Sequence, residues 1–154
     1  MGIEIERKFL VKDGSWREQA GAGLSCKQGY LVTDRDKVVR IRVMGEKAYL
    51  TIKGATYGLS RSEYEYEIPV IDAEGMLQFC ANVPVEKTRY LIEHAGMTWE
   101  LDVFTGMNAG LIMAELELES EDQEFELPAW AGEEVSGDER YYNSYLTKKP
   151  YSRW

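Results

Sequence analysis

The stretch that decides the fold is Ile3-Glu4-Ile5-Glu6-Arg7-Lys8-Phe9, residues 3–9, close to the start of the chain. Side chains alternate between the two faces of a β-strand, so Glu4, Glu6 and Lys8 share one face. Arg7 falls on the other face with the apolar residues. Two carboxylates beside an ammonium group can hold a divalent cation next to an anion. An ordinary solvent-exposed strand would show the same charges, so this stretch alone leaves both interpretations open.

The composition of the whole chain limits the protein classes to consider. Its 154 residues suffice for a proper hydrophobic core, and we expect one domain over residues 1–154. A hydrophobic content of 44% argues against disorder. No apolar run approaches the length of a membrane span and no signal-peptide pattern is present, so we expect a cytoplasmic protein with no membrane partner. The net charge of −9 argues against nucleic acid as a partner.

The cysteines and the histidine exclude several kinds of site. Cys26 and Cys80 are far apart and form no metal-ligand spacing, so we expect buried reduced thiols. His94 is the only histidine, which excludes a metal site built from several histidines. It also lies in a strand-like run with no motif around it, which argues against a Ser-His-Asp triad.

Most of the chain shows the two-residue period of β-strands, separated by turn signals. The expected strands cover residues 2–11, 28–32, 38–44, 47–53, 60–69, 85–94, 98–104 and 111–119. We expect a loop over 54–58, a helix over 72–81 with Asp72 as its N-cap, and a short closing helix over 139–146. Residues 13–23 fit a short helix or a loop. Eight strands in antiparallel hairpin order predict a mainly β fold, a closed barrel with a few peripheral helices.

The charged phase of each strand is unusually pure in sign. A solvated sheet face usually mixes signs, because like charges on neighbouring positions repel. Here Arg40 and Arg42 form a basic pair, and so do Lys87 and Arg89, whereas the acidic runs are Glu63-x-Glu65-x-Glu67, Glu100-x-Asp102 and Glu115-x-Glu117-x-Glu119. Carboxylates can be neutralised by Mg²⁺ or Mn²⁺, and guanidinium and ammonium groups by a polyanion. The pattern therefore favours an inverted barrel with a polar lumen and an apolar outer face. Where helices do not fully cover it, such a face suits a homodimer.

Some of these charges have a simpler interpretation. Glu67, Glu93, Glu100 and Glu119 lie near the ends of their expected strands. We interpret them as ordinary surface charges.

With these residues together, the chain resembles the CYTH superfamily, the triphosphate tunnel metalloenzymes. The resemblance covers nearly the whole length and rests on seven charged elements in the family's order. These are E-x-E-x-K at Glu4, Glu6 and Lys8, R-x-R at Arg40 and Arg42, T-x-K at Thr51 and Lys53, E-x-E at Glu63 and Glu65, K-x-R at Lys87 and Arg89, the aspartate Asp102, and a late E-x-E at Glu115 and Glu117.

The resemblance implies an eight-stranded antiparallel tunnel that binds a linear triphosphate with Mg²⁺ or Mn²⁺. It assigns the phosphate chain to Lys8, Arg40, Arg42, Lys53, Lys87 and Arg89. It makes Glu4, Glu6, Glu63, Glu65, Asp102, Glu115 and Glu117 candidates for metal ligation, directly or through water. Lys8, Lys87, Glu4 and Glu6 are the candidates for the catalytic role.

The leading hypothesis is metal-dependent hydrolysis of inorganic tripolyphosphate to pyrophosphate and phosphate. The same family includes class IV-type adenylate cyclases and thiamine triphosphatases, and the charged set alone does not separate these outcomes. An alternative of another class is a non-catalytic barrel that binds a polyphosphate or a nucleotide. A carrier of apolar ligands would need an apolar lumen, with the charged phase outside. Because crowded carboxylates resist simultaneous ionisation, the enzyme hypothesis also predicts activity on the alkaline side of neutral.

Overall fold

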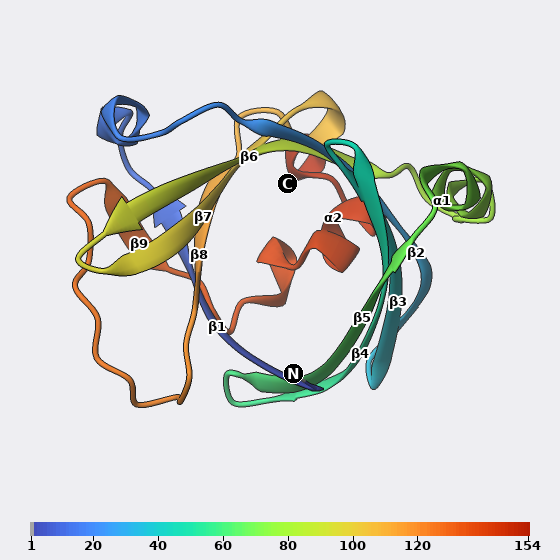
Figure 1. Ribbon diagram of the computed structural model, residues 1–154, viewed down its shortest axis with the longest axis horizontal. Coiled ribbons are helices and arrows are strands. Elements are labelled where there is room, and N and C mark those ends of the chain that lie inside the picture. The colour runs from blue at the N-terminus through green and yellow to red at the C-terminus, as the bar shows by residue number, and fades with distance from the viewer. Residues whose placement is uncertain (1) are drawn as a thin grey trace.

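The computed structural model describes residues 2–154, and its strands form an antiparallel sheet that closes on itself (Figure 1). Across this range the strand order is β5-β4-β3-β2-β6-β7-β8-β1-β9, and β5 also pairs with β1. The strands are β1 Gly2–Val11, β2 Leu24–Asp34, β3 Lys37–Met44, β4 Lys47–Tyr57, β5 Ser60–Ile68, β6 Val85–His94, β7 Met97–Phe104, β8 Ile112–Glu117 and β9 Ala131–Glu134. The β5–β1 pairing closes β1 to β8 into a barrel, which confirms the predicted architecture.

The strands differ from the sequence prediction by more than two residues in three places. The loop expected over 54–58 is wrong, because β4 continues to Tyr57 with an irregular register between Lys53 and Thr56. The turn then needs only two residues, and Gly58 supplies its positive φ of 64°. Strand β2 begins at Leu24, earlier than expected. Strand β9 was not predicted, because its four residues are too few to show a period. It pairs with the C-terminal end of β1.

The two predicted helices both differ from the sequence prediction. Helix α1 spans Val70–Leu77, and its N-cap is Pro69 rather than Asp72. The fixed φ of proline suits a helix start, and Asp72 then lies in the first turn, where a carboxylate complements the helix dipole. The closing helix is also corrected: Tyr142 is extended, so the segment divides into η3, Glu139–Tyr141, and α2, Asn143–Lys148. The remaining short helices are η1 Ser15–Glu18, η2 Gly106–Asn108 and η4 Tyr151–Arg153.

The hydrophobic core lies outside the barrel wall, as the inverted pattern predicted. Trp99 on β7 packs against Phe9 on β1 and against Trp130, with ring centroids 5.6 Å apart in both pairs. Trp16 of η1 is buried in the same cluster. A separate cluster forms under α1, which packs on the outer side of β2, β3 and β4 (Figure 1). Flanking segments therefore cover much of the apolar phase, while Ile3, Ile52, Tyr64 and Tyr66 stay exposed on the outer face. The charged phase is left for the lumen.

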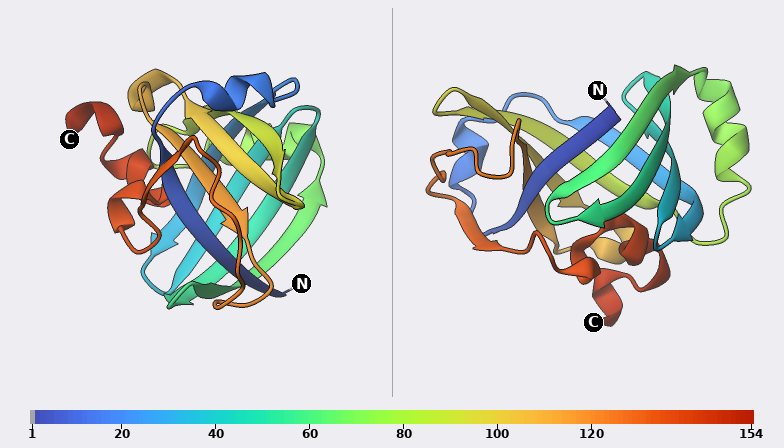
Figure 2. Two further views of the ribbon diagram at one scale, coloured as in Figure 1. Left: turned by 90° about the vertical axis from the view of Figure 1, so that its left-hand side faces the viewer. Right: turned by 90° about the horizontal axis from the view of Figure 1, so that it is seen from below.

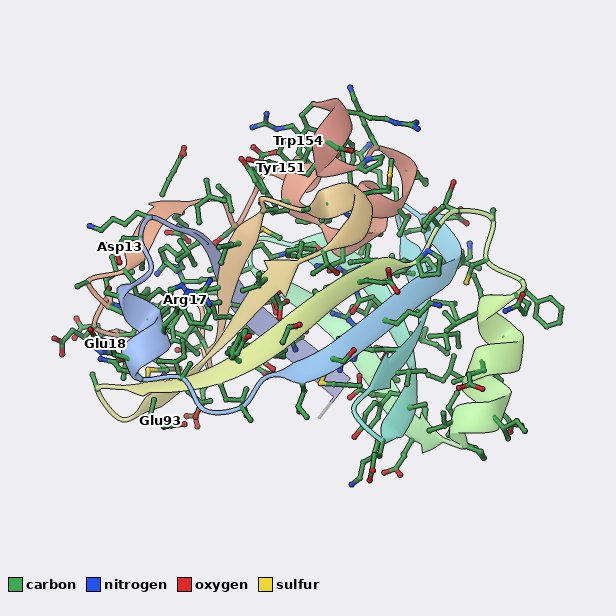
Figure 3. All side chains as sticks on the ribbon, turned by 90° about the horizontal axis from the view of Figure 1, so that it is seen from above. Asp13, Arg17, Glu18, Glu93, Tyr151 and Trp154 are labelled. Atoms are coloured by element: carbon green, nitrogen blue, oxygen red, sulfur yellow. The ribbon has the colours of Figure 1, made fainter. Side chains whose placement is uncertain are left out.

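The chain end after β9 lies across one end of the barrel. Figure 1 shows α2 through the barrel, at its far end, and Figure 2 shows the same segment beside one rim. Leu146 of α2 is buried with Val85 and Phe104 of the wall. The aromatic rings of Tyr151 and Trp154 pack together on the outer side of this segment, with their centroids 5.0 Å apart, and Figure 3 labels both residues. In the described range 2–154, no helix has the length and apolar character needed to cross a lipid bilayer.

Candidate active site

A cavity of about 230 Å³ lies inside the barrel, and charged side chains line it. It contains every residue of the predicted site except Asp102. These residues are Glu4, Glu6, Lys8, Arg40, Arg42, Lys53, Glu63, Glu65, Lys87, Arg89, Glu115 and Glu117. Strand alternation thus brings together, inside one barrel, charges that are spread over more than a hundred positions of the chain.

The two signs of charge occupy different halves of the barrel wall. In the strand order, the basic residues come from the neighbouring strands β4, β3 and β6, with only β2 between the last two. The acidic residues come from β7, β8, β1 and β5, which complete the circle. Among the residues that line the cavity, Lys8 on β1 and Arg61 on β5 are the exceptions on the acidic half. A ligand in the lumen therefore has a basic wall on one side and a mainly acidic wall on the other.

Two guanidinium groups of the basic wall have donors without an acceptor. Arg40 and Arg42 lie 3.2 and 3.5 Å from the same oxygen of Glu65. The Nε atoms of both arginines are nevertheless buried and have no hydrogen-bond partner among the described residues. Burying a donor without an acceptor destabilises a fold, so such groups usually have a specific reason. An anion in the cavity would supply acceptors for these guanidinium groups.

Asp102 lies behind the basic wall rather than in the cavity. Its side chain is 1% exposed. It accepts two hydrogen bonds from Arg89, at 2.8 and 2.9 Å, and lies 2.8 Å from Nζ of Lys87. Burial acts to raise the pKa of Asp102, but the charges of Lys87 and Arg89 outweigh it and lower the pKa. Both oxygens are thus engaged by the two cations, and the contacts fix where Lys87 and Arg89 lie.

The acidic wall contains a carboxyl group that resists ionisation. Glu6 is half-buried and lines the cavity. Burial raises its pKa well above the ordinary value, and the charges of Glu115 and Glu4 add to the effect. Burial also opposes the ionisation of Glu115, yet Lys8 and Arg89 hold the pKa of that carboxyl well below its ordinary value. Crowding therefore raises some of the carboxyl pKa values, as predicted, while neighbouring cations lower others.

Glu6 and Glu117 are the acidic residues best placed to receive a cation. They are direct partners across β1 and β8. Neither has a lysine or arginine nitrogen within 4 Å in the part of the chain that the structure describes, whereas Glu4 lies 3.0 Å from Nζ of Lys53. Residues 2–154 contain no preformed cage of three or more His, Cys, Asp or Glu side chains. Mg²⁺ does not require such a cage, because it commonly keeps several waters and takes one or two carboxylates together with substrate phosphates.

Several residues of the cavity were missed or misjudged from the sequence. Glu100 was interpreted as a surface charge, which is wrong: it lines the cavity and lies 2.9 Å from Arg89. Glu100 shares the strand phase of Asp102, and this alternation was sufficient to predict that it faces the lumen. Asn143 accepts a hydrogen bond from Nζ of Lys87 at 3.0 Å, and the carbonyl oxygen of Tyr141 accepts one from Nζ of Lys8 at 3.1 Å. No strand period marks these two, because they come from the segment that crosses the barrel end.

Arg7 and Arg61 complete the account of the charged strands. Arg7 lies on the outer face, as predicted, where it forms a bidentate pair with Glu134 of β9 at 2.8 and 2.9 Å. Arg61 was not predicted as a site residue, yet it lines the cavity together with Glu63 and Glu65. It shares their strand phase, which was a usable signal.

Comparisons with known proteins agree with this geometry. The model of the CYTH domain family matches residues 2–144. An inorganic triphosphatase from Acetivibrio thermocellus is 49% identical over 155 residues, covering 100% of this chain and 99% of the relative. An inorganic triphosphatase from Nitrosomonas europaea is 42% identical, covering 93% and 95% of the two chains. The crystal structure of an inorganic triphosphatase superposes with a TM-score of 0.64 at 39% identity, over 94% of this chain and 93% of the other. The chain belongs to the CYTH domain family.

Proposed function

We propose that the barrel hydrolyses inorganic tripolyphosphate with the help of Mg²⁺ or Mn²⁺. The observation that carries the proposal is the division of the lumen into a basic wall and an acidic wall. A linear polyanion fits against the first, and a divalent cation between the polyanion and the second neutralises the carboxylates. Relatives at 49% and 42% identity that are named inorganic triphosphatases support the same substrate.

The basic wall would bind and orient the phosphate chain. The unpartnered Nε atoms of Arg40 and Arg42 offer donors to one part of the chain. Lys87 and Arg89, fixed by Asp102, offer donors to another part, and Lys53 and Lys8 complete the set. Phosphoryl transfer requires little covalent participation by protein, so positioning and neutralisation of developing charge account for most of the rate increase. Lys8 and Lys87 are the groups we expect to stabilise the negative charge that develops on the departing phosphate.

The acidic wall would hold the metal ion. Glu6 and Glu117 are the first candidates because they have no cationic partner, with Glu4 and Glu115 beside them and Glu63 and Glu65 on β5 as further candidates. When bound, Mg²⁺ or Mn²⁺ supplies charge neutralisation on phosphate oxygens and promotes ionisation of an attacking water. Asp102, with both oxygens engaged by Lys87 and Arg89, would act through those two cations rather than as a direct ligand.

One assay separates hydrolysis of tripolyphosphate from the alternatives. The purified protein is incubated with tripolyphosphate, ATP or thiamine triphosphate in Mg²⁺ or Mn²⁺, and orthophosphate and cyclic AMP are both measured. We expect orthophosphate mainly from tripolyphosphate. Cyclic AMP from ATP would establish a cyclase instead, and a preference for thiamine triphosphate would establish the other phosphatase. Tight binding without turnover of any substrate would favour the non-catalytic barrel. A cytoplasmic location and a homodimer stay predictions.

A further inference from the structure

We propose that Arg61 is a specificity-determining residue that binds the unsubstituted terminal phosphate of the chain at the mouth of the tunnel. The proposal rests on the proposed function, because it concerns which triphosphates the same lumen prefers. Arg61 would favour inorganic tripolyphosphate over triphosphates whose end carries an organic group.

The position of Arg61 marks one end of the lumen. It lies near the start of β5, in the phase of Glu63 and Glu65, and is paired with Glu4 across β1 and β5. It lines the tunnel cavity and also an adjoining cavity of about 1060 Å³. The two cavities share Val38, Thr56, Gly58, Tyr142 and Ser144 besides Arg61. Arg61 therefore stands where the tunnel opens into a wider chamber.

Hydrogen bonds to the backbone hold the guanidinium group of Arg61 in place and leave some of its donors unused. Its Nε and Nη2 atoms donate to the carbonyl oxygen of Gly54 at 3.2 and 3.0 Å. Gly54 lies on β4 within the irregular stretch between Lys53 and Thr56. Those two bonds leave Nη1 and the second hydrogen of Nη2 available, and this edge of a guanidinium can bind two phosphate oxygens at once.

The charge of Arg61 is not compensated by protein. Every other cation lining the tunnel has a carboxylate oxygen within 4 Å: Lys8 has Glu115, Arg40 and Arg42 have Glu65, Lys53 has Glu4 and Glu63, and Lys87 and Arg89 have Asp102. Arg61 has no such partner within residues 2–154. An anion bound at the mouth of the tunnel would therefore neutralise the charge of Arg61.

The chemistry of a phosphate chain explains why this contact discriminates. An unsubstituted terminal phosphate presents three non-bridging oxygens and up to two negative charges. An esterified phosphate presents two such oxygens, one charge and a carbon substituent in place of the third oxygen. ATP has one unsubstituted and one esterified end, and the wider chamber beyond Arg61 has more room for its nucleoside than the tunnel, so we expect ATP to place its esterified phosphate beside Arg61. The guanidinium therefore gains more from tripolyphosphate, because charge-assisted hydrogen bonds are stronger and bidentate ones more selective.

The test measures binding without turnover. Dissociation constants for tripolyphosphate and for ATP are determined by calorimetry in EDTA, with the wild type, Arg61→Gln and Arg61→Lys. The control is Arg17→Gln, because Arg17 lies on η1 at the outside of the barrel (Figure 3). Arg61→Gln should weaken tripolyphosphate binding about tenfold, the expected loss of one charge-assisted interaction, and ATP binding less than about twofold. Arg61→Lys should recover only part of the loss, and Arg17→Gln should match the wild type.

Steady-state kinetics in Mg²⁺ supply a second readout. KM for tripolyphosphate should rise about tenfold in Arg61→Gln while kcat stays within about twofold. Equal losses for tripolyphosphate and ATP, or unchanged binding of both, would overturn the proposal. If Arg61→Gln fails to fold because the bonds to Gly54 are lost, Arg61→Lys decides: it must bind tripolyphosphate more weakly than the wild type and ATP equally well. If the wild type binds tripolyphosphate with this pattern but hydrolyses none, the proposed function fails and the role of Arg61 stands.

Discussion

Arg89 donates two hydrogen bonds to Asp102 inside the barrel wall, at 2.8 and 2.9 Å, and the second oxygen of Asp102 also lies 2.8 Å from Nζ of Lys87. One buried carboxylate thus neutralises and orients two cations that face the lumen. Removing one member of a buried ionic group leaves the others uncompensated, which usually costs about 3–5 kcal/mol.

Asp102→Asn should therefore lower both stability and activity. The amide keeps the size of the side chain but not its charge, so Lys87 and Arg89 lose their shared partner. We expect the free energy of unfolding to fall by about 3 kcal/mol and kcat/KM for tripolyphosphate to fall by about a hundredfold. Denaturant titration and phosphate release measure the two effects. Asp13→Asn, at an exposed position outside the barrel (Figure 3), is the control, and an equal loss in both variants would contradict the role of Asp102.

Glu6→Gln should stabilise the metal-free protein at alkaline pH. The pKa of Glu6 is raised in the folded state, by burial and then by the charges of Glu115 and Glu4. Below the ordinary pKa of a glutamate the group is protonated in both states, so it costs nothing. As the pH rises from that value through the raised pKa, the unfolded state loses its proton first and the fold becomes less stable. The side-chain amide of the Glu6→Gln variant does not ionise, so the variant does not lose stability in this way.

Thermal unfolding in EDTA checks this sign. The Tm of Glu6→Gln should exceed that of the wild type at pH 8, and the difference should vanish near pH 4. Glu18→Gln, at an exposed position on η1 (Figure 3), should show no such dependence. Adding Mn²⁺ at pH 8 should raise the Tm of the wild type but not that of Glu6→Gln, because a ligand of the folded state stabilises it. A lower Tm of Glu6→Gln in EDTA would contradict the crowding of carboxylates at Glu6.

Metal affinity should rise with pH for the same reason. A cation at the acidic wall requires Glu6 as a carboxylate, so binding releases its proton. At limiting Mg²⁺, kcat/KM for tripolyphosphate should increase from pH 6 toward alkaline pH, and saturating Mg²⁺ should reduce this dependence. A pH–rate profile with its maximum well below neutrality would count against the assignment. Calorimetry in two buffers of different ionisation enthalpy measures the released proton directly.

Neighbouring residues on β1 provide a direct test of which face is inside. Lys8 contacts Glu115 and the carbonyl oxygen of Tyr141 at the cavity, whereas Arg7 pairs with Glu134 and contacts the ring of Phe125 outside. Lys8→Gln should reduce kcat by a hundredfold or more, the usual cost of losing an electrostatic contact to the transition state. Arg7→Gln should leave kcat and KM within about twofold and lower stability by about 1 kcal/mol or less. Similar losses of activity in both would contradict the predicted strand phase.

The sequence predicts the faces of the strands well and depth within the barrel poorly. Alternation from Glu4 to Glu6 to Lys8 identifies the lumen side, because a two-residue period depends only on local backbone geometry. It does not say how far along the tunnel a residue lies or what stands in front of it. Asp102 therefore had the right phase but lies behind Lys87 and Arg89, and Glu100 near a strand end lies in the cavity.

Features that depend on contacts between distant segments were not predictable in this way. Strand β9 exists through its pairing with β1, and its four residues carry no period of their own. Asn143 contacts Lys87 because the chain end folds across the barrel opening. No local sequence pattern predicts that arrangement. Arg61 is a different case: it lies within the expected strand over 60–69 and in the phase of Glu63, so its face was predictable although it was not predicted as a site residue.

The most direct measurement of the central claim is the product released from tripolyphosphate by the wild-type protein in Mg²⁺, followed beside ATP under the same conditions. The proposed hydrolysis of tripolyphosphate predicts orthophosphate and pyrophosphate in equal amounts early in the reaction, with EDTA abolishing the release. It also predicts a much slower release of phosphate from ATP and no cyclic AMP. Metal-independent hydrolysis, or cyclic AMP as the main product from ATP with no turnover of tripolyphosphate, would contradict it.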